Sequence, residues 1–249
     1  MGLSIQALHV GTIVGLSRAT LTYGRGHAEL AEAELIMFLI TGGEHPVIVD
    51  TGSASTEDVR LRHGVTVTRS PEQEPLSALA AAGIDPADVR TVVNTHLHWD
   101  HSSNNHLFPN ARVYVQTSEL QYAIDPLGPN QKSYERVPGL QPHWLNALAR
   151  TQGVDGDHAL MSGITLVHLP GHTPGSQGVL VEADSARYLL AGDCVSCYAN
   201  WLGDELLPHI PAGFTNLHDY MDSFRKIEGL DCVVIPSHDA GVLAKRYFD

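Results

Sequence analysis

The chain has 249 residues, of which 43% are hydrophobic and 17% charged, and its formal net charge is −13 with the histidines neutral. This length suits one sizeable α/β domain or two small ones, and the composition is ordinary for a globular protein. The acidic balance argues against a nucleic-acid partner, whose phosphates favour a basic surface. The apolar run 35–40 is far shorter than a membrane span and the N-terminus has no signal-peptide pattern, so we expect a cytoplasmic protein without a membrane partner.

The first half of the chain reads as short apolar strands separated by turns. Residues 42–45 (Gly-Gly-Glu-His) are a turn signal between two of these strands and predict a hairpin. The polar stretches 18–34 and 53–75 lack clear periodicity, and we expect irregular segments there, the second near the site entrance. We expect strands over 4–13, 33–41, 46–50, 91–94 and 112–116, and helices over 75–83 and 117–123.

The second half contains a loop, more strands and the clearest helical pattern. The stretch 125–141 is punctuated by Pro and Gly and reads as a loop or lid. Over 215–228 the apolar residues recur at helical spacing, which is typical of core packing, and Thr215 is a candidate N-cap. We also expect a helix over 143–150 and strands over 163–169, 177–182 and 188–192.

The chain is organised around residues 95–101, Thr-His-Leu-His-Trp-Asp-His, which follow one of the expected strands. Alternate side chains of an extended segment point the same way, so His96 and His98 can face one side together. Asp100 and His101 follow as the chain turns, and they can reach a second point nearby. One metal ion rarely takes all its ligands from so short a run, whereas two neighbouring ions can if other segments complete each set.

Three further residues of ligand type each follow a short apolar run. His172 lies in a turn rich in Pro and Gly, and Asp193 and His238 come directly after apolar strands. Loops at strand ends are where a rigid scaffold presents chemistry. A single histidine in such a place is more often a core or capping residue than a ligand, but together these residues predict a complete metal site. The other histidines match no pattern, and we interpret them as surface or core residues: His9, His45, His106, His168, His209 and His218.

In this order, the seven residues resemble the signature of the metallo-β-lactamase fold superfamily, an H-x-H-x-D-H run followed by a separate His, Asp and His. Within the superfamily, the chain is most similar to the N-acyl homoserine lactonase (quorum-quenching lactonase) group, from residues 47–52 to His238. The resemblance implies an α/β fold, the four-layer αβ/βα sandwich of two mixed β-sheets flanked by helices. Because no stretch reads as a linker, we expect one hydrolase domain over residues 1–249.

The resemblance also implies a role for each residue of the pattern. Asp50, at the end of an expected strand, would orient the histidine-rich loop, although such a residue can also simply bond backbone amides. Imidazole and carboxylate ligands without thiolate suit two divalent ions, Zn²⁺ first and also Fe, Mn or Co. One ion would be held by His96, His98 and His172, the second by Asp100, His101 and His238, and Asp193 would bridge both.

Such a site indicates hydrolysis. A zinc ion lowers the pKa of its bound water to about 7, so a water shared by two cations is a hydroxide near neutral pH. Its attack on a lactone carbonyl would open the ring, and Asp100 could carry the proton to the leaving oxygen. We therefore predict a carboxylic-ester hydrolase that opens N-acyl homoserine lactones or a related small lactone. Another metal-dependent hydrolase, a thioesterase, esterase or β-lactamase-like amidase, is the alternative.

One position departs from the lactonase pattern. In that group a tyrosine three residues after the bridging aspartate is thought to contact the substrate carbonyl, and here that position is Ser196. Tyr198, two residues further on, is a candidate for the same catalytic role or for the pocket wall. Cys194 and Cys197 form a C-x-x-C, which we interpret as loop residues beside the site because no second such pair is present.

Other members of the superfamily fit less well. Glyoxalase II relatives carry a helical C-terminal extension, and oxygen- or nitric oxide-reducing relatives carry a flavin domain, and neither pattern is expected here. A nuclease would favour an added basic domain, which the acidic balance opposes. We expect the segments 18–34 and 125–141 to set the small-molecule substrate, and we allow for a homodimer, for which the sequence carries no signal.

Overall fold

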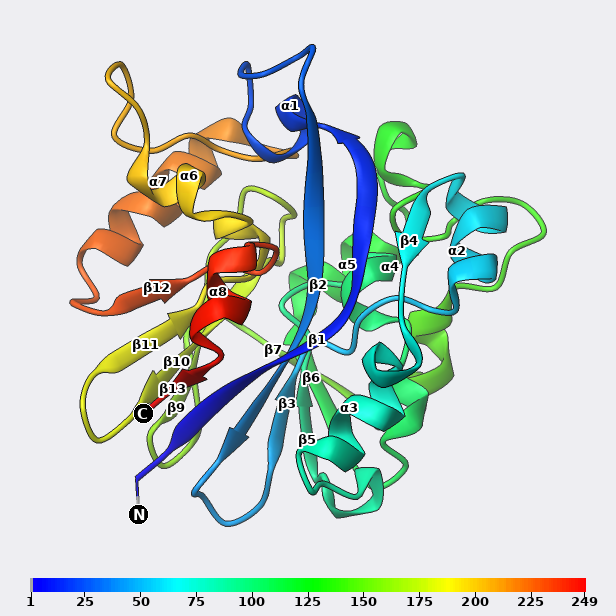
Figure 1. Ribbon diagram of the computed structural model, residues 1–249, viewed down its shortest axis with the longest axis vertical. Helices are drawn as coiled ribbons and strands as arrows, with labels where there is room; N and C mark the ends of the chain where they lie inside the picture. Colours follow the sequence, from blue (N-terminus) through cyan, green and yellow to red (C-terminus); the bar gives the residue numbers. More distant parts are fainter. Residues whose placement is uncertain (1) are drawn as a thin grey trace.

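The computed structural model describes residues 2–249 and places them in two β-sheets with helices on the outer sides (Figure 1). The strands are β1 (Ser4–Ser17), β2 (Leu30–Thr41), β3 (Val47–Val49), β4 (Thr66–Thr68), β5 (Thr91–Val93), β6 (Arg112–Gln116), β7 (Thr151–Val154), β8 (His158–Met161), β9 (Ile164–His168), β10 (Gln177–Glu182), β11 (Arg187–Leu190), β12 (Val233–Ile235) and β13 (Tyr247–Phe248). The α-helices are α1 (Arg18–Leu21), α2 (Thr56–His63), α3 (Pro75–Ala81), α4 (Trp99–Ser102), α5 (Thr117–Ile124), α6 (Tyr198–Leu202), α7 (Leu217–Glu228) and α8 (Ala240–Lys245). Short 3₁₀ helices are η1 (Pro71–Gln73), η2 (Pro86–Asp88), η3 (Asn105–Leu107), η4 (Gly128–Asn130), η5 (His143–Arg150) and η6 (Gly192–Val195).

Both sheets are mixed. Within residues 2–249 the larger sheet has eight strands in the order β13-β1-β2-β3-β5-β6-β7, and β4 pairs with β1 off this path. β1, β2 and β3 pair antiparallel, with Phe38 opposite Val49, whereas β3, β5, β6 and β7 are parallel. The smaller sheet has five strands in the order β12-β11-β10-β9-β8, and β11 pairs in parallel with β12. This arrangement confirms the predicted αβ/βα sandwich.

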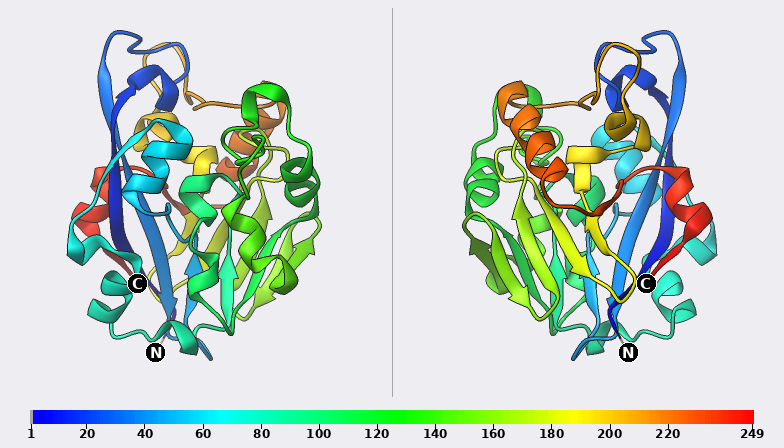
Figure 2. Two further views of the ribbon diagram at one scale, coloured as in Figure 1. Left: turned by 90° about the vertical axis from the view of Figure 1, so that its right-hand side faces the viewer. Right: turned by 90° about the vertical axis from the view of Figure 1, so that its left-hand side faces the viewer.

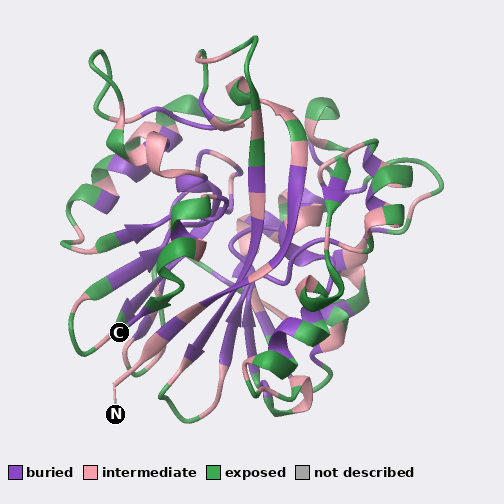
Figure 3. Ribbon diagram, viewed as in Figure 1, coloured by how far each residue is buried: buried purple, intermediate pink, exposed green. Residues whose placement is uncertain are grey.

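An apolar core lies between the two sheets, and outer helices cover their other faces (Figure 2). Strands buried on both faces read as continuous apolar runs, and Val47–Val49 is such a run, with all three residues buried. The strands are mostly buried, whereas the helices mix buried and exposed residues and many of the outer loops are exposed (Figure 3). The core between the sheets includes Phe38, Val49, Val179, Leu190 and Ile235. On the far side of the smaller sheet, α7 packs through Tyr220, Phe224 and Ile227.

The expectation that residues 53–75 are irregular is wrong, because they contain α2 and β4. Ser55 caps α2, its Oγ accepting a hydrogen bond from the Asp58 N–H at 3.2 Å, and Gly64 ends the helix with φ of 66°. α2 buries only Val59 and His63, so it offers almost no apolar periodicity from which to predict a helix.

The helix expected over 215–228 begins at Leu217, and its N-cap is Asn216 instead of Thr215. The Asn216 side chain accepts hydrogen bonds from two backbone N–H groups of the first turn. The Thr215 hydroxyl instead donates to the carbonyl of Gly171, in the turn that carries a predicted metal ligand. The helix expected over 143–150 is present as the 3₁₀ helix η5.

The predicted hairpin of 33–41 and 46–50 is present as β2 and β3. β1 and β2 form a further hairpin that extends beyond the predicted strands 4–13 and 33–41, to Ser17 and from Leu30, so the irregular segment between them is shorter than expected. Its far end, with α1, lies at the top of Figure 1. The predicted loop 125–141 contains η4 as its regular element among the described residues. No helix within residues 2–249 has the length and apolar character needed to cross a membrane.

Candidate metal centre

The seven predicted ligand residues meet where strands of both sheets end. Residues 96–101 follow β5 of the larger sheet and lead into the short helix α4. The smaller sheet contributes His172 after β9, Asp193 after β11 and His238 after β12. The carboxyl ends of these strands therefore place all seven side chains together, which the sequence pattern predicted.

Three overlapping groups of donor atoms form the centre, and the atoms of each group lie within 4.8 Å of one another. The imidazole of His96 is central, with its ring centroid 4.4 Å from that of His98 and 4.1 Å from that of His101. Imidazole and carboxylate donors that lie this close together suit divalent cations. The three groups are His96, His98 and His172; His96, His101 and Asp193; and Asp100, His101 and His238.

In the second group of ligands, hydrogen bonds made by Nδ1 show which ring nitrogen faces the centre. The Nδ1 of His101 lies 2.8 Å from a carboxylate oxygen of Asp50, and the Nδ1 of His238 lies 2.8 Å from the carbonyl oxygen of Glu34. Both partners only accept, so both Nδ1 atoms carry the hydrogen. The Nε2 atoms of His101 and His238 lie 3.2 Å apart, and the Asp193 carboxylate lies 3.3 and 3.1 Å from them, so this cluster attracts a positive charge, either a proton on the rings or a bound cation.

In the first group of ligands, hydrogen bonds again show which ring nitrogens face the centre. The Nδ1 of His172 donates to the carbonyl oxygen of Gly213 at 2.6 Å, which leaves its Nε2 as a lone pair 3.1 Å from the Nδ1 of His98. The Nε2 atoms of His96 and His98 are buried and have no hydrogen-bond partner in the described structure. Buried polar atoms are normally paired, so the orphaned Nε2 of His96, together with the Nδ1 of His98 that faces the His172 Nε2, fits a site that a metal ion completes.

Burial and charge set the protonation of the centre. Burial lowers the pKa of His96 and His98 well below the usual value, so both rings are neutral and can act as ligands. For Asp193, burial alone would raise the pKa, but the adjacent His238 and His101 outweigh it and hold this pKa well below its usual value. The Asp193 carboxylate lies 3.1 Å from the His238 Nε2 and 3.5 Å from the His172 Nε2, so it reaches both groups.

Asp50 lies behind the ligands and holds two residues of the loop that carries them. Its side chain is almost fully buried and its φ of 57° is unusual for a residue other than glycine. One carboxylate oxygen accepts from the Thr95 N–H at 2.8 Å, and the other accepts from the Thr95 hydroxyl and the His101 Nδ1, each at 2.8 Å. Through these contacts Asp50 holds the histidine-rich loop, as the resemblance implied.

The centre opens into a pocket of about 360 Å³. An apolar wall comes from the β1–β2 hairpin and α1, and Trp99 and Phe214 also line the pocket. Ser196 lines this pocket, whereas Tyr198 does not. The Tyr198 ring packs against the core between the sheets and lies close to Gly241, so the structure does not bring it to the other predicted site residues.

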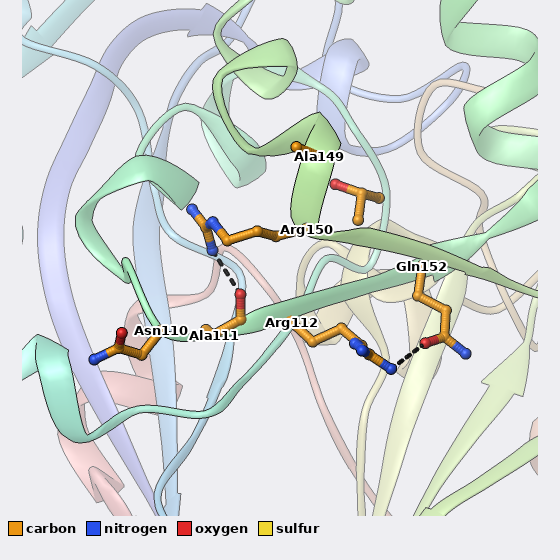
Figure 4. Close-up of a pocket in the computed structure, with 7 residues that line it drawn as sticks. Asn110, Ala111, Arg112, Ala149, Arg150 and Gln152 are labelled. Carbon is orange, nitrogen blue, oxygen red and sulfur yellow. Dashed lines mark hydrogen bonds between the residues drawn. The ribbon is translucent and has the colours of Figure 1, made fainter.

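A larger pocket of about 460 Å³ lies elsewhere, beside β6 and β7 (Figure 4). Its two arginines are held by the protein itself: Arg150 donates to the carbonyl oxygen of Ala111 at 2.6 Å, and Arg112 donates to Gln152 at 2.9 Å. Among the described residues, no group of metal-ligating side chains lies in this pocket. The chemistry therefore belongs to the smaller pocket above the histidines.

Two residues of the centre were not identified from the sequence. The backbone carbonyl of Glu34 orients His238, and the buried side chain of Glu119 contacts the loops that carry the ligands. Burial raises the pKa of Glu119, although four hydrogen-bond donors surround the group. Neither residue sits in a motif, and a glutamate within a helix gives no signal that it is buried.

The family model of the metallo-beta-lactamase superfamily matches residues 37–238, and the chain belongs to this superfamily. Its donor cluster fits the dinuclear site of divalent cations that the superfamily implies. The chain is 31% identical over 238 residues to the N-acyl homoserine lactonase AttM of Rhizobium radiobacter, covering 86% of this chain and 85% of the relative. AttM of Azorhizobium caulinodans is 32% identical over 230 residues, with the same two coverages of 86% and 85%.

A solved structure supports the fold. An N-acyl homoserine lactone hydrolase, with the product N-hexanoyl-L-homoserine bound at its catalytic metal centre, superposes with a TM-score of 0.79. The match covers 97% of this chain and 95% of that chain at 20% sequence identity. At this identity the likeness concerns the fold, which is the αβ/βα sandwich described above.

Proposed function

We propose that this chain is a metal-dependent hydrolase that opens the ring of N-acyl homoserine lactones or a closely related small lactone. The observation that carries the proposal is the pair of ligand groups that meet at Asp193 beneath a pocket with one apolar wall. The name of the AttM relatives, N-acyl homoserine lactonase, supports the same reaction. An apolar wall next to the centre suits a substrate whose polar ring is attached to an acyl chain.

In this proposal each ligand group holds one divalent cation. The donor set contains imidazole and carboxylate but no thiolate, which suits Zn²⁺ and also admits Fe, Mn or Co. When bound, the two cations supply Lewis acidity toward the ester carbonyl and lower the pKa of water. His96, His98 and His172 would hold one ion, Asp100, His101 and His238 the other, and Asp193 both.

Asp100 is the candidate proton carrier. It lines the pocket, and one of its carboxylate oxygens lies 3.7 Å from the His101 Nε2 and 3.9 Å from the His238 Nε2. A carboxylate that faces both the ligands and the substrate space can accept a proton there and pass it to a leaving oxygen. We propose this role for Asp100 beside its role as a ligand.

Ser196 and Tyr198 are the two candidates for contact with the substrate carbonyl. Ser196 lines the pocket, and its backbone carbonyl accepts the His238 N–H at 2.8 Å, so its position is tied to a ligand. Tyr198 lies outside the pocket lining. We therefore favour Ser196 as the residue that contacts substrate, and the role of Tyr198 stays a prediction from sequence.

Proton release in weak buffer tests the proposal. Ring opening yields a carboxylic acid, so N-acyl homoserine lactones of several chain lengths are added to the metal-loaded protein, with and without prior chelation. We expect release that chelation abolishes and that depends on chain length. No release from protein shown to carry two metal ions would refute the homoserine lactone assignment and redirect the search to esters, thioesters and amides.

Three further expectations belong to this proposal. The core that joins both sheets supports one domain over residues 1–249. The cytoplasmic location and the homodimer stay predictions from sequence. Metal analysis of the purified protein would decide between zinc and the other candidate ions, because zinc is colourless and redox-silent whereas the others give absorption or spin-resonance signals.

A further inference from the structure

Glu119 is a completely buried carboxylate on α5, close to the metal centre but outside the ligand set. One of its oxygens accepts from the Leu97 N–H at 2.9 Å and from the Tyr134 hydroxyl at 2.7 Å. The other accepts from the Thr173 hydroxyl at 2.6 Å and from the Gly175 N–H at 3.2 Å. Each oxygen therefore receives one backbone N–H and one hydroxyl.

Three of these donors belong to the two loops that present one ligand group, and the fourth, Tyr134, comes from the segment 125–141. Leu97 lies between His96 and His98, and Thr173 directly follows His172. The single carboxylate thus joins the loop from the larger sheet to the loop from the smaller sheet at the ligands they share. The contact is close, since a Cβ added at Gly175 would lie 2.2 Å from the backbone nitrogen of Glu119.

The other ligand group has its own supports. Asp50 accepts the Nδ1 hydrogen of His101, and the carbonyl of Glu34 accepts that of His238. Glu119 and Asp50 are both buried carboxylates that accept backbone and hydroxyl hydrogens, but each acts on a different part of the centre. Asp50 contacts a ligand of its own group, His101, directly and reaches the first group only through Thr95, which precedes His96, so the main support of each group is a different carboxylate.

We propose that Glu119 is a positioning residue that sets the geometry of the metal subsite formed by His96, His98 and His172. This inference rests on the two-metal site proposed above. Loss of one carboxylate oxygen as an acceptor weakens the hydrogen bonds that connect the two loops, so the affinity of this subsite for its ion falls. The ion beside Asp50 keeps its supports and is retained.

Glu119→Gln is the sharpest variant, because glutamine has the same shape. Whichever way the amide turns, its NH₂ group meets one hydroxyl and one backbone N–H. The hydroxyl of Tyr134 or Thr173 can rotate to accept, but the N–H of Leu97 or Gly175 cannot. One loop must then shift. Glu44→Gln, in an exposed turn, removes the same charge without touching the centre and is the matched control.

The test measures metal content after dialysis and the rate at which a chelator removes each ion. We expect wild type and Glu44→Gln to retain two ions per chain. After dialysis we expect Glu119→Gln to retain about one ion. When the fully loaded protein meets the chelator, we expect one ion to be removed faster by roughly tenfold or more and the other at a rate within about twofold of wild type, which is the size of effect typical for loss of a residue that supports a metal ligand. With cobalt as the probe, the absorption of one site should change and that of the other should not.

Three outcomes separate the inference from its alternatives. Two ions retained by Glu119→Gln with unchanged removal rates would overturn it, as would equal loss of both ions together with a less stable metal-free protein. Fewer than two ions in wild type would refute the two-metal site itself. If Glu119→Gln does not fold, Tyr134→Phe removes one donor only and should accelerate the same removal phase by a smaller factor.

Discussion

Replacing Asp50 with asparagine is the substitution whose effect on the centre follows most directly from the structure. The carboxylate accepts three hydrogen bonds of 2.8 Å, from the Thr95 N–H, the Thr95 hydroxyl and the His101 Nδ1. Asparagine keeps one acceptor oxygen and turns an NH₂ toward the remaining donors. Either the Thr95 N–H or the His101 Nδ1–H then faces another donor inside the protein.

Both stability and metal affinity should fall. A buried donor left without an acceptor costs about 1–3 kcal/mol of folding free energy. Loss of the partner that orients a metal-ligating histidine lowers metal affinity by roughly 10- to 100-fold, which corresponds to about 1.4–2.7 kcal/mol. If the amide faces His101, the ring changes tautomer or turns, and its Nε2 no longer presents a lone pair to the centre.

Two measurements separate these effects. Chemical unfolding of the metal-free protein reports the folding term, and chelator competition at fixed pH reports the affinity term. Asp155→Asn, at an exposed position, is the control for loss of one negative charge. If Asp50→Asn matched this control in both measurements, the assignment of Asp50 as the residue that orients His101 would be refuted.

Three further predictions follow from the centre and its surroundings. His172→Ala should leave one metal ion per chain and reduce lactone turnover by roughly 100-fold or more, measured by metal analysis and proton release. Ser196→Ala should lower kcat/KM by roughly tenfold while Tyr198→Phe stays within about twofold, and the reverse order would restore Tyr198 as the contact. Glu135 is buried and, despite that burial, His143 and His63 hold its pKa below the usual value, so its stabilisation is present above about pH 4.5 and is lost as pH falls. Glu135→Gln should therefore be less stable by about 1–3 kcal/mol at pH 7, with a difference that shrinks in acid unfolding curves.

The ligand residues could be predicted from the sequence because each follows a strand that is buried. Such strands appear as uninterrupted apolar runs, and the first polar residues after them lie in loops at the sheet edge. Val233–Ile235, in which Val234 and Ile235 are buried, precedes His238, and Val47–Val49 precedes the supporting residue Asp50 in the same way. Because His96 and His98 are two residues apart in an extended segment, their side chains could be predicted to point the same way.

The supporting residues could not be predicted in this way. Glu119 lies in an eight-residue helix, and its burial results from the approach of Gly175 and Thr173, which are distant in the sequence. Glu34 acts through its backbone carbonyl, so its residue type carries no signal. Tyr198 is a candidate because it lies two residues beyond the position where the lactonase group has its tyrosine; η6 and α6 turn the chain here, and the ring packs against the core between the sheets.

The division of ligands between the sheets has a consequence for how the centre forms. For each proposed ion the larger sheet supplies two ligands after β5, and the smaller sheet supplies one histidine, His172 or His238, and the shared Asp193. Neither group is complete within one sheet, so the apolar core between the sheets must be in place before either ion has its full set of ligands. A bound ion in turn holds the two sheets together, and its binding free energy adds to the stability of the packed state. Glu119 joins the same two loops by hydrogen bonds alone, and it can therefore hold them in register before any metal ion binds.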